Sequence, residues 1–169
     1  MSGEIVNRVA KSGLITLDLT DYAPTIKVIG FDLKDFLFEG IILKEKQFRL
    51  SLKEFNFKQY ENTCVAVFCS SDCVIPMWAF MLVASHLNNV AEEIHYGNER
   101  AVFEQLFLRN IKNVKHVKFK NKKVIVKGCG QVPLSGALYI EIAKILQNTV
   151  DSLMFGEACS AVPIYKKKK

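Results

Sequence analysis

The stretch that decides the fold runs from Cys64 to His86 and reads CVAVFCSSDCVIPMWAFMLVASH. It opens with β-branched and aromatic residues, which favour a strand, and breaks in a polar turn that carries Cys69, Asp72 and Cys73. From Pro76 onward it becomes an apolar segment that predicts a buried helix. These features indicate the first half of a β–α–β unit. Ligands of open α/β sheets bind beyond the carboxyl ends of strands, so the polar turn is a candidate site.

Strand and helix patterns alternate on both sides of this stretch. The alternation predicts an α/β fold: a single domain over residues 1–165, with a largely parallel or mixed sheet flanked by helices. The four lysines at 166–169 are expected to form a flexible tail. Strands are predicted at 14–17, 25–31, 93–96 and 152–155, and 115–119 with 123–127 is predicted as a hairpin or one long bent strand.

Composition narrows the class of protein. Half of the residues are apolar and 24% are charged, which suits a globular domain with a sizeable core. The lysine run supplies much of the net charge of +6, and we expect no nucleic-acid partner because no other basic patch is interleaved with aromatic residues. The N-terminus lacks the apolar core of a signal peptide, and the longest apolar run, at 74–84, is shorter than the ~20 residues that span a bilayer. We therefore predict a cytoplasmic protein without membrane association.

Five cysteines in a reducing compartment are expected to be thiols or metal ligands. Cys69, Cys129 and Cys159 each follow a predicted strand, and the last two begin the same pattern, C-x-x-V-P-[LI]. If the strands are parallel neighbours, the three turns open on one edge of the sheet and the thiols converge. With Asp72 between two cysteines, the predicted metal ligands are Cys69, Asp72, Cys129 and Cys159.

Three functions fit such an arrangement. The first is a thiol-rich metal-binding or iron–sulfur-related accessory protein, because zinc and iron centres take thiolates from separate turns. The second is a sulfur-transfer or redox enzyme, with Cys129 as the nucleophile because two glycines leave it accessible. The third is a non-catalytic interaction module whose cysteines only pack, since free cysteine is often buried like a small apolar residue.

The remaining candidates have structural explanations as well. Cys64 lies inside a strand pattern, where packing is favoured, and Cys73 is either packed at the helix start or part of the site. Asp72 is a helix cap or a ligand. Glu157 lies near Cys159, and His95 ends a strand, so either could join the site.

Five segments carry a resemblance to a known family: SGLITLDL at 12–19, IILKEK at 41–46, CSSDCVIPMWAFML at 69–82, KGC at 127–129 and MFGEACSAVPIYK at 154–166. On these segments the chain resembles, nearly end to end, an uncharacterised Bacteroidetes family of small cytosolic proteins. The family's Cys and Asp positions fall on Cys69, Asp72, Cys129 and Cys159, whereas Cys73 departs from the family pattern, in which alanine is commoner. The resemblance implies no activity. It suggests iron–sulfur assembly proteins as partners.

Overall fold

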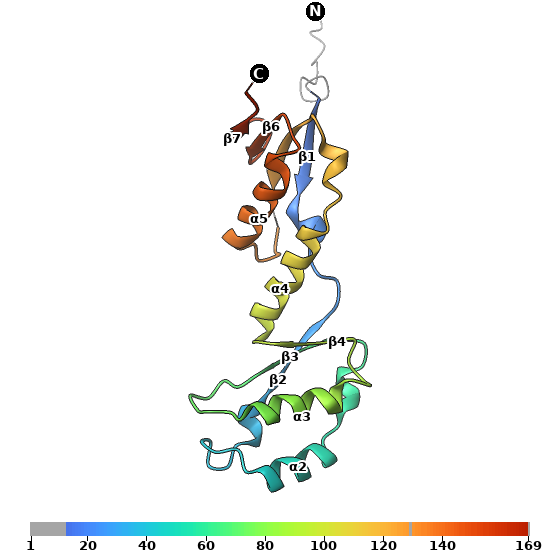
Figure 1. Cartoon of the computed structure of the whole chain (residues 1–169), viewed down its shortest axis with the longest axis vertical. Helices are drawn as coiled ribbons and strands as arrows, with labels where there is room; N and C mark the ends of the chain where they lie inside the picture. Colours follow the sequence, from blue (N-terminus) through green and yellow to red (C-terminus); the bar gives the residue numbers. More distant parts are fainter. Residues whose placement is uncertain (1–12, 129, 169) are drawn as a thin grey trace, which may run out of the picture. The chain divides into compact units, whose positions relative to one another are not determined.

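The computed structural model describes residues 13–128 and 130–168, in which strands and helices alternate along the chain (Figure 1). The predicted α/β class with largely parallel or mixed strand pairing is confirmed. The strands form two sheets, and the chain divides into two compact units. Residues 1–23 and 106–169 make up what we call the terminal unit, and residues 24–105 make up the inserted unit.

The inserted unit contains a parallel sheet with the strand order β2-β3-β4. Each crossover between its strands contains a helix, as parallel pairing requires. The strands are β2 (Val28–Asp32), β3 (Cys64–Phe68) and β4 (Glu93–Tyr96); the helices are η2 (Leu33–Phe36), α2 (Glu45–Glu54), η3 (Phe57–Tyr60) and α3 (Met77–Leu87), where η denotes a 3-10 helix.

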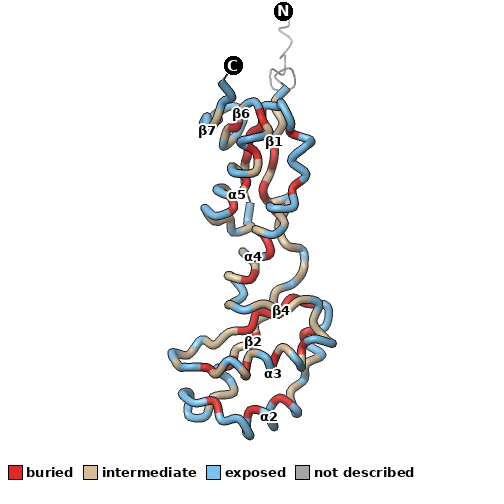
Figure 2. Tube along the Cα trace, viewed as in Figure 1, coloured by how far each residue is buried: buried red, intermediate tan, exposed pale blue. Residues whose placement is uncertain are grey.

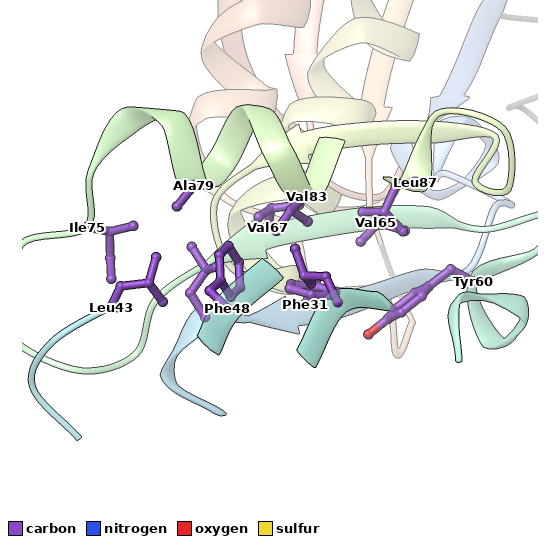
Figure 3. Packing of buried hydrophobic residues seen from close by; sticks show 12 residues of the cluster. Phe31, Leu43, Phe48, Tyr60, Val65, Val67, Ile75, Ala79, Val83 and Leu87 are labelled. Atoms are coloured by element: carbon purple, nitrogen blue, oxygen red, sulfur yellow. The ribbon is translucent and has the colours of Figure 1, made fainter. Parts of the chain in front are cut away.

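The core of the inserted unit lies between this sheet and its two α-helices. Helix α3 places Ala79, Val83 and Leu87 on one stripe because residues four apart share a face, and all three are fully buried (Figure 3). They pack in one cluster with Val65 and Val67 of β3. The centre of β3 is buried, as the apolar run in the sequence indicates (Figure 2).

The terminal unit contains a second sheet with the strand order β1-β5-β6-β7. The first three strands are parallel, and β7 pairs with β6 antiparallel at the edge. The elements are β1 (Leu14–Asp18), η1 (Leu19–Tyr22), η4 (His116–Phe119), β5 (Lys123–Lys127), α5 (Gly136–Gln147), β6 (Ser152–Phe155) and β7 (Val162–Lys166). Helix α4 (Glu99–Lys112) begins in the inserted unit and ends in the terminal unit.

The two units repeat the same sequence of elements. Residues 14–22 correspond to 28–36, each a strand that leads into a 3-10 helix. Residues 57–98 correspond without a gap to 116–157, each a 3-10 helix, strand, α-helix and strand in the same order. In both series the helix buries residues at matching places: Ala79, Val83 and Leu87 in α3, and Leu138, Ile142 and Leu146 in α5.

Backbone details follow the same correspondence. Asn62 and the corresponding Asn121 have positive φ values of 57° and 56°, a conformation that asparagine tolerates better than most residues. The N–H of Gly97 donates to the carbonyl of Val67 at 3.0 Å, and the N–H of Gly156 donates to that of Val126 at 3.0 Å. Such agreement in turns and hydrogen bonds shows that one supersecondary structure occurs twice in the chain.

Two sequence-based predictions differ from the structure. Residues 116–119 form the 3-10 helix η4 instead of a strand. The corresponding segment before β3 is also a 3-10 helix, η3. Of the expected lysine tail, Lys166 is the last residue of β7, and the N–H of Lys167 donates to the carbonyl of Asp151 at 2.9 Å. These two lysines belong to the sheet edge because the alternating segment before them continues the antiparallel pairing.

The repeat predicts matched costs for core truncation. Leu87 and the corresponding Leu146 are both fully buried, so Leu87→Ala and Leu146→Ala should each lower the free energy of unfolding by about 2–5 kcal/mol. Hydrogen exchange followed by mass spectrometry should show the loss of protection in the unit that carries the substitution. A cost below about 1 kcal/mol for either variant would contradict the packing described here.

Candidate functional site

The candidate site is the loop between β3 and α3, at the carboxyl end of the central strand of the inserted unit. It contains Cys69 and Cys73, both partly buried, and both pack against the hydrophobic core. The loop forms because the apolar strand ends at Phe68 and the next apolar helix begins after Pro76, which favours the start of a helix. The sequence analysis placed a candidate site in this turn.

The two sulfur atoms in this loop are neighbours. Cys69 Sγ lies 3.7 Å from Cys73 Sγ and 3.8 Å from the carbonyl oxygen of Ser71. The N–H of Cys73 donates to the same carbonyl at 2.9 Å, which folds the loop back on itself. The loop therefore holds two thiols in contact, with the side chains exposed enough to react.

A carboxylate from the neighbouring strand anchors the loop. Asp32 ends β2, and its Oδ1 accepts hydrogen bonds from the N–H of Ser70 at 3.0 Å and from that of Lys34 at 2.9 Å. The second bond caps the 3-10 helix η2. Burial opposes ionisation of Asp32, but the hydrogen bonds from Ser70 and Lys34 outweigh it and lower the pKa of this carboxyl group.

The environment of Cys73 favours its protonated form. Desolvation raises the pKa of the Cys73 thiol, and the hydrogen bond and charge of Cys69 raise it further. The negative charges of Asp72 and Asp32 act in the same direction. These neighbours together keep the Cys73 thiol protonated.

The other predicted ligands are distributed over the chain. Cys69 belongs to the inserted unit and Cys159 to the terminal unit, where Cys159 is exposed and its Sγ lies 4.0 Å from Ser160 Oγ. Cys129 lies outside the described residues. Within residues 13–128 and 130–168, no three His, Cys, Asp or Glu side chains are grouped so that they could hold a metal ion. The shared site of Cys69, Asp72, Cys129 and Cys159 stays a prediction.

The acidic and imidazole candidates have other neighbours. Asp72 is exposed and does not cap α3: the N-cap residue is Pro76, with no side-chain cap. Glu157 Oε1 lies 3.6 Å from Lys127 Nζ, and His95 Nε2 lies 2.9 Å from Glu93 Oε2. Each of these two candidates thus has an oppositely charged or ionisable neighbour of its own.

Sequence reasoning left the role of Cys73 open. The signal for its contact with Cys69 is the spacing of four residues across a Ser-Ser-Asp turn, which is short enough to bring the two side chains together. The repeated pattern C-x-x-V-P-[LI] drew attention to Cys129 and Cys159 instead. In the structure, Cys159 precedes the antiparallel strand β7 and not a helix, so the repeated pattern does not mark a repeated site.

The comparisons with known proteins give one match. A family described as "Protein of unknown function (DUF2480)" matches residues 3–167. No curated protein and no solved structure matches the chain. In the part of the chain that the structure describes, none of the helices has the length and apolar character needed to cross a membrane.

The anchoring role of Asp32 predicts a graded response to substitution. Asp32→Asn keeps an oxygen acceptor for Ser70 and Lys34 and should cost little at pH 7, whereas Asp32→Ala should cost about 1 kcal/mol. Urea unfolding of the two variants and the wild type measures this difference. Equal losses in both variants would contradict the acceptor role.

The same carboxylate predicts a dependence of stability on pH. Because the pKa of Asp32 is lower in the folded chain than its ordinary value of 3.8, its contribution is fully present above pH 3.8 and disappears as the pH falls through the folded value. Asp32→Asn should therefore lose less stability than the wild type between pH 5 and 2. Asp21→Asn, at an exposed position of the terminal unit, serves as the control.

Proposed function

This chain belongs to the DUF2480 family, and we propose that its Cys69–Cys73 pair is a redox-active dithiol that performs thiol–disulfide exchange. The observation that supports the proposal is the 3.7 Å separation of the two sulfur atoms in a loop at the carboxyl end of β3. A disulfide needs the sulfurs at about 2.05 Å, so small side-chain rotations in the loop suffice to form the bond.

The proposed reaction exchanges two electrons with a disulfide in a substrate. The thiolate of Cys69 attacks one sulfur of the substrate disulfide, the substrate S–S bond breaks, and the departing sulfur takes up a proton. Cys73 then loses its proton and attacks the Cys69 sulfur, which releases the second substrate sulfur as a thiol. The substrate disulfide is reduced to two thiols, and Cys69 and Cys73 are oxidised to a disulfide. The reverse sequence oxidises a substrate dithiol.

The environment of each sulfur supports this division of roles. Cys73, whose pKa is raised, keeps its proton and can donate a hydrogen bond to Cys69. This leaves Cys69 as the attacking group. Cys73 is then the resolving thiol. A cytoplasmic location, which we expected from the sequence, would keep the resting pair reduced.

Metal binding is the second candidate, and a distance favours it. Two thiolates bound at ~2.3 Å to one tetrahedral ion lie about 3.8 Å apart, close to the 3.7 Å between Cys69 and Cys73. Zinc or iron would need two further ligands, which we propose come from among Asp72, Cys129 and Cys159. An accessory role beside iron–sulfur assembly proteins belongs to this candidate.

The redox proposal predicts a specific cross-link. Mild oxidation of the full chain with diamide should join Cys69 to Cys73, because their Sγ atoms lie 3.7 Å apart. Peptide mapping under non-reducing conditions should show the joined peptide, and dithiothreitol should release it. Cys69→Ser and Cys73→Ser should each prevent this cross-link, whereas Cys159→Ser, at an exposed position, should leave it unchanged.

The assay for function is the reduction of a protein disulfide. Wild-type protein should accelerate the reduction of insulin by dithiothreitol, and Cys69→Ser should abolish the acceleration because it removes the attacking sulfur. Cys73→Ser should instead accumulate the mixed disulfide between Cys69 and the substrate. A wild-type protein without the cross-link and without acceleration would refute the redox proposal.

The metal candidate has its own measurement. If Cys69 and Cys73 hold zinc or iron, anaerobically purified protein should contain about one metal ion per chain, and each single Cys→Ser substitution should remove most of it. Asp72→Asn should then also reduce the metal content, because it removes a negatively charged ligand. Metal-free protein with a rapidly formed Cys69–Cys73 disulfide would favour the redox function over this one.

A further inference from the structure

Each unit contains a small pocket at the same place in the repeat, beside its first strand. The pocket of the inserted unit has a volume of about 280 Å³, and that of the terminal unit about 310 Å³. Corresponding residues line both. In the inserted unit these are Gly30, Phe31, Asp32, Asp35, Phe36 and Tyr60. In the terminal unit they are Thr16, Leu17, Asp18, Asp21, Tyr22 and Phe119.

Both pockets combine carboxylates with aromatic rings. The motif D-L-x-D-[FY] supplies two aspartates and an aromatic residue each time, at 18–22 and at 32–36. A second ring comes from the last residue of the 3-10 helix before the following strand of each unit. This residue is Tyr60 of η3 in the inserted unit and Phe119 of η4 in the terminal unit. Carboxylates attract cations, and the faces of aromatic rings do so as well. The shared lining is therefore suited to an organic cation.

In the terminal unit the chain supplies this cation itself. Lys118 lines the pocket, and its Nζ lies 4.9 Å from the centroid of the Phe119 ring. The Lys118 ammonium thus lies over this ring at a pocket whose lining also contains Asp18 and Asp21. Asp18 itself pairs with Lys127, with 3.7 Å between Lys127 Nζ and Asp18 Oδ2. In this unit, two ammonium groups of the chain therefore lie beside the carboxylates and the ring.

The pocket of the inserted unit has no lysine in its lining. The position that corresponds to Lys118 is Gln59, which is exposed and uncharged. This pocket has an additional carboxylate, that of Glu99, which lies directly against Gly30; a Cβ atom at residue 30 would collide with it. Asp32, Asp35 and Glu99 together line the pocket, and Lys34, whose charge acts on Asp32, lies outside the lining.

We propose that the pocket of the inserted unit binds a primary alkylammonium group from another molecule. The carboxylates of Asp35 and Glu99 provide the charge, and the rings of Phe36 and Tyr60 contact the alkyl part. The ammonium group takes the place that the Lys118 side chain takes in the terminal unit. It comes either from a small diamine or from a lysine side chain of a partner protein.

The test is a titration of the full-length, ¹⁵N-labelled protein followed by NMR. The first probe is 1,5-diaminopentane, and the second is Nα-acetyl-lysine amide. 1-Pentanol is the uncharged control. Either amine should shift the amide signals of Gly30, Asp35 and Tyr60, and the probe that binds more tightly identifies the source. Binding of neither amine, or equal binding of 1-pentanol, overturns the proposal.

Four substitutions separate this site from general attraction to an acidic surface. Asp35→Asn and Glu99→Gln should each weaken amine binding about tenfold, because each removes a charged hydrogen-bond acceptor. Gln59→Lys should abolish binding by placing an internal lysine where Lys118 lies in the other unit. Lys118→Gln should create a second amine site, with new shifts at Asp21, while Asp18 keeps its ion pair with Lys127.

Gln59 and Lys118 are both exposed, so Gln59→Lys and Lys118→Gln should fold. The dispersion of the amide signals in the NMR spectrum of each variant verifies that it is folded. Unchanged affinity in Asp35→Asn and Glu99→Gln would place the bound amine elsewhere and refute the site. Failure of Lys118→Gln to bind a second amine would refute the equivalence of the two pockets, on which the proposal depends.

Discussion

The inserted unit depends on the two hydrogen bonds that the carboxylate of Asp32 accepts. It caps η2 through the N–H of Lys34 and anchors the thiol loop through that of Ser70, so it joins the ends of β2 and β3. Its charge also contributes to the raised pKa of Cys73. Because one side chain performs these tasks, the geometry of the two sulfurs depends on a residue that touches neither of them directly. The same carboxylate lines the proposed amine pocket.

The duplication places the same capping aspartate in both units with different side chains beside it. Asp18, which corresponds to Asp32, caps η1 in the same way but lies 3.7 Å from Lys127 Nζ, and Lys127 corresponds to Phe68. The terminal unit therefore uses its aspartate in an ion pair at the end of β5, whereas the inserted unit uses the corresponding aspartate to hold the thiol loop. The same backbone fold thus occurs twice in the chain, with different side chains at corresponding positions.

Much of the fold could be predicted from local patterns. The alternation of apolar strands and amphipathic helices is visible in the sequence, and it places β3, α3, β4 and β6 within a few residues of their observed bounds. The partition into two sheets depends on the pairing of β1 with β5, which lie more than a hundred residues apart, and no local pattern reports that pairing. The repeat was hidden because burial and turn geometry, more than residue identity, define it. Likewise, the turn after β3 was recognisable as a candidate site, but the contact of Cys73 with Cys69 depends on how the loop folds back at Ser71.

The most direct test of the proposed dithiol is an equilibrium redox titration of the full chain in glutathione buffers, followed by the ¹³Cβ chemical shifts of its cysteines. Cys69 and Cys73 should change together in a single two-electron transition, while the buried Cys64 keeps its reduced shift throughout. Two results would contradict the proposed dithiol. Cys69 and Cys73 could titrate separately, or neither could change before the exposed Cys159 forms a mixed disulfide with glutathione. In either case the two sulfurs do not act as a redox pair.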